Sequence, residues 1–128
     1  MPQSRHSFQS IDAQGEIVRV VQLTDTHLCK ALGGTLLGMD TDHSLQAVID
    51  LVKKERSTVD LLLATGDLSD GGAPEAYDRL QGYLNQLTEA NYWLPGNHDS
   101  RPAMEAVADS SASLCGEIRV SRWQVLLL

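Results

Sequence analysis

Asp60-Leu61-Leu62-Leu63-Ala64-Thr65-Gly66-Asp67 is the stretch of this sequence that decides the fold. Residues 61–64 are all apolar, and a short run without polar alternation is typical of a strand buried on both faces in a parallel sheet. Gly66 then allows the backbone to turn sharply and approach a ligand. A carboxylate, that of Asp67, is therefore expected at the point where this strand ends.

Segments with strand and helix periodicity alternate on both sides of this stretch. Strands are expected over residues 17–23, 60–64, 92–94, 118–121 and 123–128, the last two forming a hairpin around Arg122. Helices are expected from a cap at Asp42 to about Lys54, from Pro74 onward, and over residues 102–108. Residues 1–14 are expected to be a loose lead-in and residues 30–41 a loop. Because strand–helix–strand alternation implies parallel pairing with helices on a sheet face, the sequence predicts an α/β fold.

Composition excludes several classes of function. The formal net charge is −7 and the pI is about 4.8, which argues against binding to nucleic acid, since that needs a basic face. The sequence has no apolar run long enough to span a membrane, and residues 1–7 lack the apolar core of a secretory signal, so a cytoplasmic location is expected. Cys29 and Cys115 form no CxxC pair and are expected to be free thiols.

Polar clusters follow three of the expected strands. They are Asp25-Thr26-His27, Gly66-Asp67-Leu68-Ser69-Asp70 and Gly96-Asn97-His98-Asp99. The C-terminal ends of parallel strands meet at one edge of a sheet, where ligands bind in such folds, so we expect the clusters to converge. Each aspartate, taken alone, is equally compatible with a turn or a cap, and only the set at three strand ends favours a site.

The first two clusters carry side chains that suit a cation. If extended geometry continues past Leu23, Asp25 and His27 point the same way and can bind one ion together. Asp67 has two carboxylate oxygens and can bridge two ions. Asp70 is expected to hold a histidine in its working orientation, although it could also cap the turn before the second helix.

The third cluster adds a neutral ligand and a titratable group. Asn97 offers a carbonyl oxygen, His98 is free to act on a substrate as a proton donor or a phosphate contact, and Asp99 can orient its surroundings. Oxygen and imidazole ligands without thiolate suit Mn, Fe or catalytic Zn. Two such ions lower the pKa of a shared water and bind a phosphoryl oxygen.

Together, these motifs resemble the signature of the calcineurin-like metallophosphoesterases. The flanking residues 23–28, 93–99 and 123–128 more narrowly resemble the bacterial class III 3′,5′-cyclic-AMP phosphodiesterases. The resemblance implies that residues 15–128 form the N-terminal half of a four-layer α/β/β/α metallophosphoesterase sandwich. It also implies an enzyme that hydrolyses 3′,5′-cyclic AMP to 5′-AMP by attack of a metal-bridging hydroxide.

The resemblance further implies a role for each motif residue. Asp25, His27 and Asp67 would hold the first of two metal ions, which are Fe, Mn or Zn. Asp67 and Asn97 would hold the second ion. His98 would protonate the leaving oxygen or contact the phosphate, with support from Asp70. The nucleotide phosphate would lie against His27, Asp67, Asn97 and His98.

The sequence departs from the family pattern after the third cluster. Members of the family continue with further histidine ligands, whereas no histidine follows His98 here. We therefore expect roughly the N-terminal half of an enzyme, or a truncated product, which by itself aggregates or binds metal poorly. The alternatives are a phosphoesterase for another nucleotide or phosphodiester, or a non-catalytic fragment that needs its missing half. The expected partner is a small cyclic nucleotide, and neither a nucleic acid nor a membrane; the sequence does not set the oligomeric state.

Overall fold

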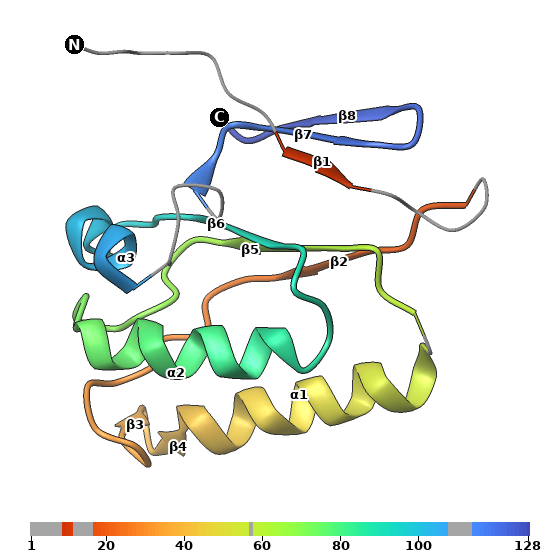
Figure 1. The fold of residues 1–128 in the computed structure, drawn as a ribbon. Helices are drawn as coiled ribbons and strands as arrows, with labels where there is room; N and C mark the ends of the chain where they lie inside the picture. Colours follow the sequence, from red (N-terminus) through yellow and green to blue (C-terminus); the bar gives the residue numbers. More distant parts are fainter. Residues whose placement is uncertain (1–8, 12–16, 57, 108–113) are drawn as a thin grey trace, which may run out of the picture.

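The computed structural model describes residues 9–11, 17–56, 58–107 and 114–128. The strands are β1 (Gln9–Ile11), β2 (Val20–Leu23), β3 (Thr35–Leu36), β4 (Met39–Asp40), β5 (Leu61–Thr65), β6 (Asn91–Leu94), β7 (Glu117–Val120) and β8 (Trp123–Leu126). The helices are α1 (Thr41–Glu55), α2 (Pro74–Asn85) and α3 (Arg101–Val107). They form a helical layer, a central sheet and a second sheet stacked in that order (Figure 1).

The central sheet consists of three parallel strands in the order β2-β5-β6. Its register pairs Val20 with Leu61, and Leu62 with Asn91. The middle strand, β5, is covered on both faces, because Leu62 and Ala64 pack in the core toward the helices while Leu61 packs in the core toward the second sheet. The parallel pairing predicted from the apolar run is thus confirmed.

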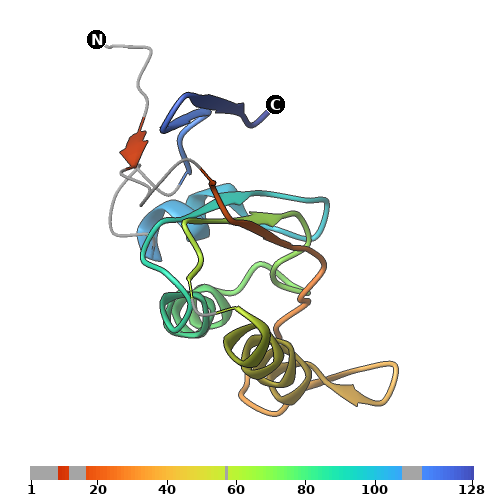
Figure 2. The same cartoon turned by 90° about the vertical axis from the view of Figure 1, so that its right-hand side faces the viewer.

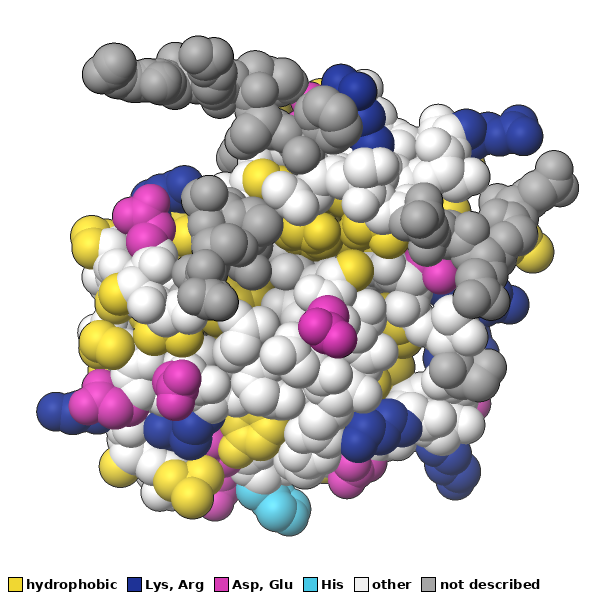
Figure 3. Space-filling model, in the orientation of Figure 1, with side chains coloured by type: hydrophobic (Ala, Val, Ile, Leu, Met, Phe, Trp, Pro, Cys, Tyr) yellow, Lys and Arg dark blue, Asp and Glu magenta, His cyan; other side chains and the backbone are white. Residues whose placement is uncertain are grey.

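The second sheet has the order β1-β7-β8, with β1 parallel to β7 and β8 antiparallel to it. It lies on the face of the central sheet opposite α1 and α2 (Figures 1 and 2). Ile118 and Val120 of β7 fill the space between the sheets with Leu61 and Tyr92. On the face shown in Figure 3, apolar side chains gather along this seam. This layering fits half of the predicted α/β/β/α sandwich.

Three local predictions were wrong. Within the expected lead-in, residues 9–11 form β1, because a strand can pair with β7 across the chain without a local signal; the other residues of 1–14 lie outside the described part. The expected loop at 30–41 contains the β3–β4 hairpin. The cap of α1 is Asp40, whose carboxylate accepts a hydrogen bond from the His43 amide at 2.9 Å, and not Asp42.

Several other predictions are confirmed with small shifts of their bounds. Pro74 begins α2, the third helix ends at Val107 with residue 108 outside the described part, and the C-terminal hairpin turns at Ser121 and Arg122. Both cysteines are free. Among the described residues, none of the helices has the length and apolar character needed to cross a membrane.

Candidate metal centre

The loops that follow β2 and β5 lie side by side at one edge of the central sheet. Their backbones continue the strand pairing, since the Asp25 amide donates to the Gly66 carbonyl at 2.9 Å and the His27 amide donates to the Asp67 carbonyl at 3.0 Å. The Leu28 amide donates in the same way to Leu68 at 3.0 Å. The backbone pairing of the sheet therefore continues into the loops and fixes the position of the first polar cluster relative to the second.

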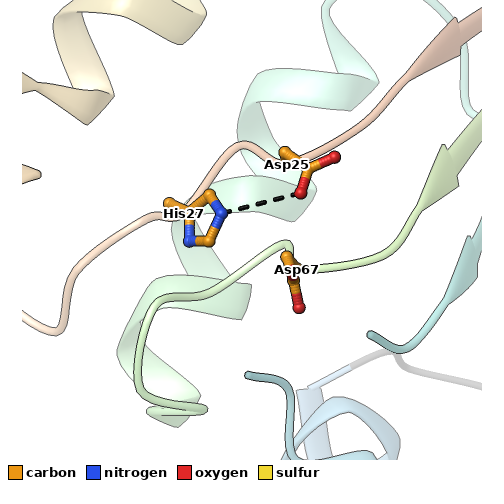
Figure 4. A group of neighbouring side chains, drawn as sticks. All are labelled: Asp25, His27 and Asp67. Carbon is orange, nitrogen blue, oxygen red and sulfur yellow. Dashed lines mark ion pairs between the residues drawn. The ribbon is translucent and has the colours of Figure 1, made fainter. Parts of the chain in front are cut away.

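Asp25, His27 and Asp67 come together at this edge (Figure 4). Each offers one ligand atom, and these atoms all lie within 4.8 Å of one another. His27 Nε2 is 3.6 Å from Asp25 Oδ1. His27 is mostly buried and Asp25 is more than half exposed, with relative side-chain exposures of 17% and 57%, so the group opens to solvent on the Asp25 side.

The backbone that delivers these side chains is not extended, which corrects the geometry assumed from the sequence. Asp25, His27 and Asp67 have φ angles of 57°, 46° and 48°. This left-handed region costs energy for residues other than glycine and is concentrated at functional sites. The side chains converge because the chain turns at each of these positions, and not because residues two apart share a strand face.

The His27 ring is oriented by Asp70. His27 Nδ1 lies 3.2 Å from Asp70 Oδ1, and a carboxylate can only accept, so Nδ1 carries the proton. Nε2 of the neutral ring is then the free ligand atom on the side of Asp25. A carboxylate behind a histidine is the usual outer contact of a metal-ligating imidazole. The resemblance had implied that Asp70 supports His98, whereas the structure places its carboxylate on His27.

His98 lies beside this group in the third loop. Its ring centroid is 5.5 Å from that of His27, at an interplanar angle of 71°. Its Nδ1 is 3.2 Å from the backbone carbonyl oxygen of Asp70, and its amide donates to Asp67 Oδ1 at 2.9 Å. His98 and its neighbour Asn97 are exposed. The third loop is thus held against Asp67 by its backbone while both side chains remain accessible.

Asp99 ties the second and third loops together more extensively than the sequence indicates. Its carboxylate accepts hydrogen bonds from the amides of Leu68 (3.1 Å), Ser69 (2.9 Å) and Gly96 (2.7 Å), and from the Tyr77 hydroxyl (2.7 Å). Burial and the hydrogen bond to Asp99 raise the pKa of Tyr77 well above its ordinary value. Tyr77 has no expected part in the site from the sequence; the signal that could have found it is that a buried tyrosine hydroxyl needs a hydrogen-bond partner.

Gly96 makes the close approach of these loops possible. A Cβ atom at this position would lie 2.3 Å from the Asp67 amide nitrogen and 2.5 Å from Asp67 Oδ1. Any larger residue would therefore push the Asp67 carboxylate out of place. Gly66, with φ at 99°, supplies the other turn that a larger residue would strain.

The donor set fits a transition-metal ion. Two carboxylates and one imidazole nitrogen within 4.8 Å suit Mn, Fe or Zn, and they lie at a solvent-accessible edge where a further ligand or a substrate can bind. Asp25, His27 and Asp67 are the residues that would hold the ion. The structure brings His98 and Asp70 next to them and leaves Asn97 on the adjoining exposed turn.

Comparison with known proteins places the site in a family context. The model of the calcineurin-like phosphoesterase family matches residues 18–123. The chain is 41% identical over 125 residues to the 3′,5′-cyclic adenosine monophosphate phosphodiesterase CpdA of Pseudomonas aeruginosa, covering 98% of this chain and 45% of that protein. It is 42% identical over 112 residues to a 3′,5′-cyclic-nucleotide phosphodiesterase of Nostoc sp., covering 87% and 42%. With CpdA of Escherichia coli K12 it shares 38% over 125 residues, covering 95% and 46%. The chain spans less than half the length of these relatives.

Proposed function

This chain belongs to the calcineurin-like phosphoesterase family, and we propose from that premise that it forms part of a metal-dependent phosphodiesterase site for 3′,5′-cyclic AMP. The observation that carries the proposal is the convergence of Asp25, His27 and Asp67, with His98 against the same group. The names of the relatives at 38–42% identity support the cyclic-nucleotide substrate.

The side chains divide the work between holding ions and handling the substrate. Asp25, His27 and Asp67 would hold one ion, and Asp67 with Asn97 would contribute to a second, each being Fe, Mn or Zn. Ions bound there would neutralise phosphate charge and lower the pKa of water. Asp70 keeps the His27 proton on Nδ1, so Nε2 presents a lone pair to the site.

His98 is the group that we assign to proton transfer. Its Nδ1 faces a backbone carbonyl, which only accepts, so this nitrogen carries a proton in both charge states of the ring. Nε2 is then the atom that gains or loses a proton on the open side. In the hydrolysis, the oxygen of a water molecule bonds to phosphorus and the water gives up one proton to solvent. The bond from phosphorus to the 3′ oxygen breaks, the imidazolium Nε2 gives its proton to that oxygen to yield 5′-AMP, and the neutral ring then regains a proton from solvent.

The expected partner is a small cyclic nucleotide, since the net charge of −7 disfavours nucleic acid. A cytoplasmic location stays a prediction. A second candidate is a chain that is not catalytic without further residues. It is favoured by the fact that the chain spans only 45% of the P. aeruginosa relative.

A decisive test needs a protein of the relatives' length. We define the joined protein as residues 1–128 in place of the matching N-terminal part of the P. aeruginosa relative. With added Mn²⁺ it is expected to form 5′-AMP from 3′,5′-cyclic AMP. Asp67→Ala and His98→Ala are each expected to lower kcat at least about 100-fold, the usual contribution of a general acid or more.

Asp78→Ala serves as the matched control, because Asp78 is an exposed carboxylate on α2 that does not belong to the candidate metal-ligand group. Its turnover should stay at the level of the parent. Unchanged turnover in Asp67→Ala or His98→Ala would remove the corresponding role. Hydrolysis of other phosphodiesters without hydrolysis of cyclic AMP would change the substrate and leave the class of reaction intact. If residues 1–128 alone convert cyclic AMP at the same rate as the joined protein, the second candidate is excluded.

A further inference from the structure

A groove of about 300 Å³ continues from the metal-ligand group toward α1. Its lining combines Asp25 and His27 with apolar side chains, which include Leu36, Leu37 and Met39 of the β3–β4 hairpin and Val48 of α1. The volume lies at the lower end of the range for small-molecule sites, which are mostly apolar with a few placed polar groups. Two of the three residues of the candidate metal-ligand group, Asp25 and His27, thus also line this groove.

Leu37 at the tip of the hairpin is unfavourable in two ways, because its apolar side chain is exposed and its backbone is left-handed. Leu37 is 99% exposed and has a φ of 52°, a conformation that is rare for a bulky residue. Gly38 follows at 84°, so the pair forms a two-residue turn of the kind that usually carries asparagine and glycine. The strain at Leu37 is not offset by burial of its side chain. Backbone strain of this kind is concentrated at ligand-binding positions. Met39, beside the tip, is 58% exposed.

The base of the hairpin is fixed in place. The Thr41 amide donates to the Gly34 carbonyl at 3.2 Å. The Arg79 guanidinium of α2 donates to the carbonyls of Cys29 and Lys30, the latter at 2.9 Å, and to the carboxylate of Asp42. The groove wall is therefore anchored to both helices, so it is largely formed before a ligand arrives.

The chemistry of the lining selects a flat, uncharged group. Among the residues that the structure describes, no lysine or arginine lines the groove, so its apolar part offers no positive charge to a second phosphate. The leucine and methionine side chains suit an aromatic face, and thioether contacts to aromatic rings are favourable. Ser44 of α1 also lines the groove, and its hydroxyl makes no hydrogen bond with any residue in the described part of the chain. This hydroxyl can donate a hydrogen bond to a ring nitrogen of a base or accept one from an exocyclic amine.

We propose that this groove binds the base of a purine nucleotide whose phosphate lies against Asp25, His27 and Asp67. The inference rests on the proposed function and adds to it the determinant of base recognition. A nucleotide joins its phosphate and its base through one ribose, and here the candidate metal-ligand group, where a bound ion would attract a phosphate, shares Asp25 and His27 with an apolar groove. The hairpin then acts in specificity, and it has no part in the chemical step.

Binding of the base can be observed in residues 1–128 without catalysis. The chain has three methionines, and the Met39 methyl lines the groove while Met104 is fully buried in the core. In a sample labelled at the methionine methyls, adenosine is expected to shift the Met39 signal and to leave Met104 in place. Ribose 5-phosphate, which lacks the base, should not shift Met39. A folded sample, recognised by the Met104 signal, in which adenosine does not move Met39 overturns the inference.

Kinetics in the joined protein give the second measurement. Leu37→Asn keeps a residue that accepts the left-handed backbone and removes the apolar contact. It is expected to lower kcat/KM for 3′,5′-cyclic AMP about tenfold. It should leave unchanged the hydrolysis of 1-O-methylribose 3′,5′-cyclic phosphate, which has the cyclic diester without the base. Leu32→Asn is the matched control, because Leu32 is 71% exposed and lies outside the groove.

The outcomes separate this inference from the proposed function. Loss of hydrolysis of both compounds in the unsubstituted joined protein contradicts the proposed function, and the adenosine titration still decides base binding. Hydrolysis of both at equal kcat/KM, with no effect of Leu37→Asn, overturns base recognition and leaves the phosphodiesterase function standing.

Discussion

Asp70 determines which nitrogen of His27 faces the candidate metal centre. The carboxylate lies 3.2 Å from Nδ1, and His27 Nε2 lies 3.6 Å from Asp25 Oδ1. Since the second loop carries both Asp67 and Asp70, one backbone segment supplies a ligand and the group that orients another ligand. A change at Asp70 should therefore act on metal binding even though Asp70 does not belong to the ligand group.

We predict that Asp70→Asn weakens Mn²⁺ binding to the joined protein about tenfold, the lower end of the effect of losing such an outer contact. The amide can still accept from Nδ1 but adds no negative charge to the ring. Isothermal titration with Mn²⁺ gives the dissociation constant. Asp78→Asn, on the exposed face of α2, provides the control. An unchanged dissociation constant in Asp70→Asn would show that His27 needs no such support.

The membership of the candidate site could be predicted from the sequence, but its local geometry could not. Asp25 and His27 follow β2 and Asp67 follows β5, and parallel strands bring the residues after them to one edge. The left-handed backbone at these positions leaves no mark in the residue types, since aspartate and histidine tolerate it without requiring it. The partner of Asp70 is set by the turn after Gly66, which only the folded chain defines.

Helices α1 and α2 are joined by a buried polar network at Asp42. Its carboxylate is paired with Arg79 at 2.9 Å and accepts a hydrogen bond from the Tyr83 hydroxyl at 2.6 Å. Burial alone would raise the pKa of Asp42, but the hydrogen bonds from Arg79 and Tyr83 together lower it below its ordinary 3.8. Burial and the bond to Asp42 in turn raise the pKa of Tyr83 to about 12.

A lowered pKa in the folded state sets the direction of the pH dependence. The stability that ionised Asp42 contributes is fully present above pH 3.8 and is lost as the pH falls through the lowered folded value. We predict that Asp42→Asn lowers the free energy of unfolding by about 3 kcal/mol at pH 7, because the Arg79 guanidinium loses the carboxylate that balances its charge. Urea unfolding of the parent and the variant measures the gap, which is the difference between their free energies of unfolding.

The gap between parent and variant should shrink as the pH is lowered below 3.8, since the parent then loses the same charge. Asp78→Asn should show neither the loss at pH 7 nor this trend. A gap that is constant from pH 7 to pH 3 would mean that packing around residue 42, and not its charge, stabilises the helix pair.

At the level of elements, the apolar runs and caps predicted the central sheet and all three helices. The elements that they missed are β1 and the β3–β4 hairpin. β1 has three residues and exists through pairing with β7, more than 100 positions along the chain, while β3 and β4 have two residues each. Strand formation of this kind depends on the partner and not on local propensity. Asp42 was mistaken for a cap because Asp40 and Asp42 flank the same helix start.

The whole molecule exposes apolar side chains where β2 meets the second sheet. Ile17 is 67% exposed, Val20 47% and Trp123 60%. With Val18, Val120 and Val125 they line a groove of about 450 Å³ at the edge of the two sheets. Contiguous apolar surface of this kind marks a contact with protein or a risk of aggregation.

We predict that residues 1–128, as an isolated chain, self-associate through this edge. Trp123→Glu should raise the monomer fraction in size-exclusion chromatography with light scattering at micromolar concentration. Leu51→Glu places the same charge at a 57% exposed leucine on α1, outside the edge, and should have no such effect. A parent chain that is monomeric and unfolds reversibly would contradict this prediction.

The hydrogen bonds to Asp99 make the second and third loops a single cooperative unit. Opening either loop alone would leave the partly buried Asp99 carboxylate without donors, or amides without an acceptor, at a cost of up to about 1–3 kcal/mol for each group. Partial opening is therefore less favourable than loss of both loops and the first turn of α2 together. The backbone that carries Asp67 and His98 is accordingly gained or lost in one step. Tyr77, which is buried in α2, belongs to the same cooperative unit, because its hydroxyl donates to the Asp99 carboxylate and accepts from the Ser100 amide.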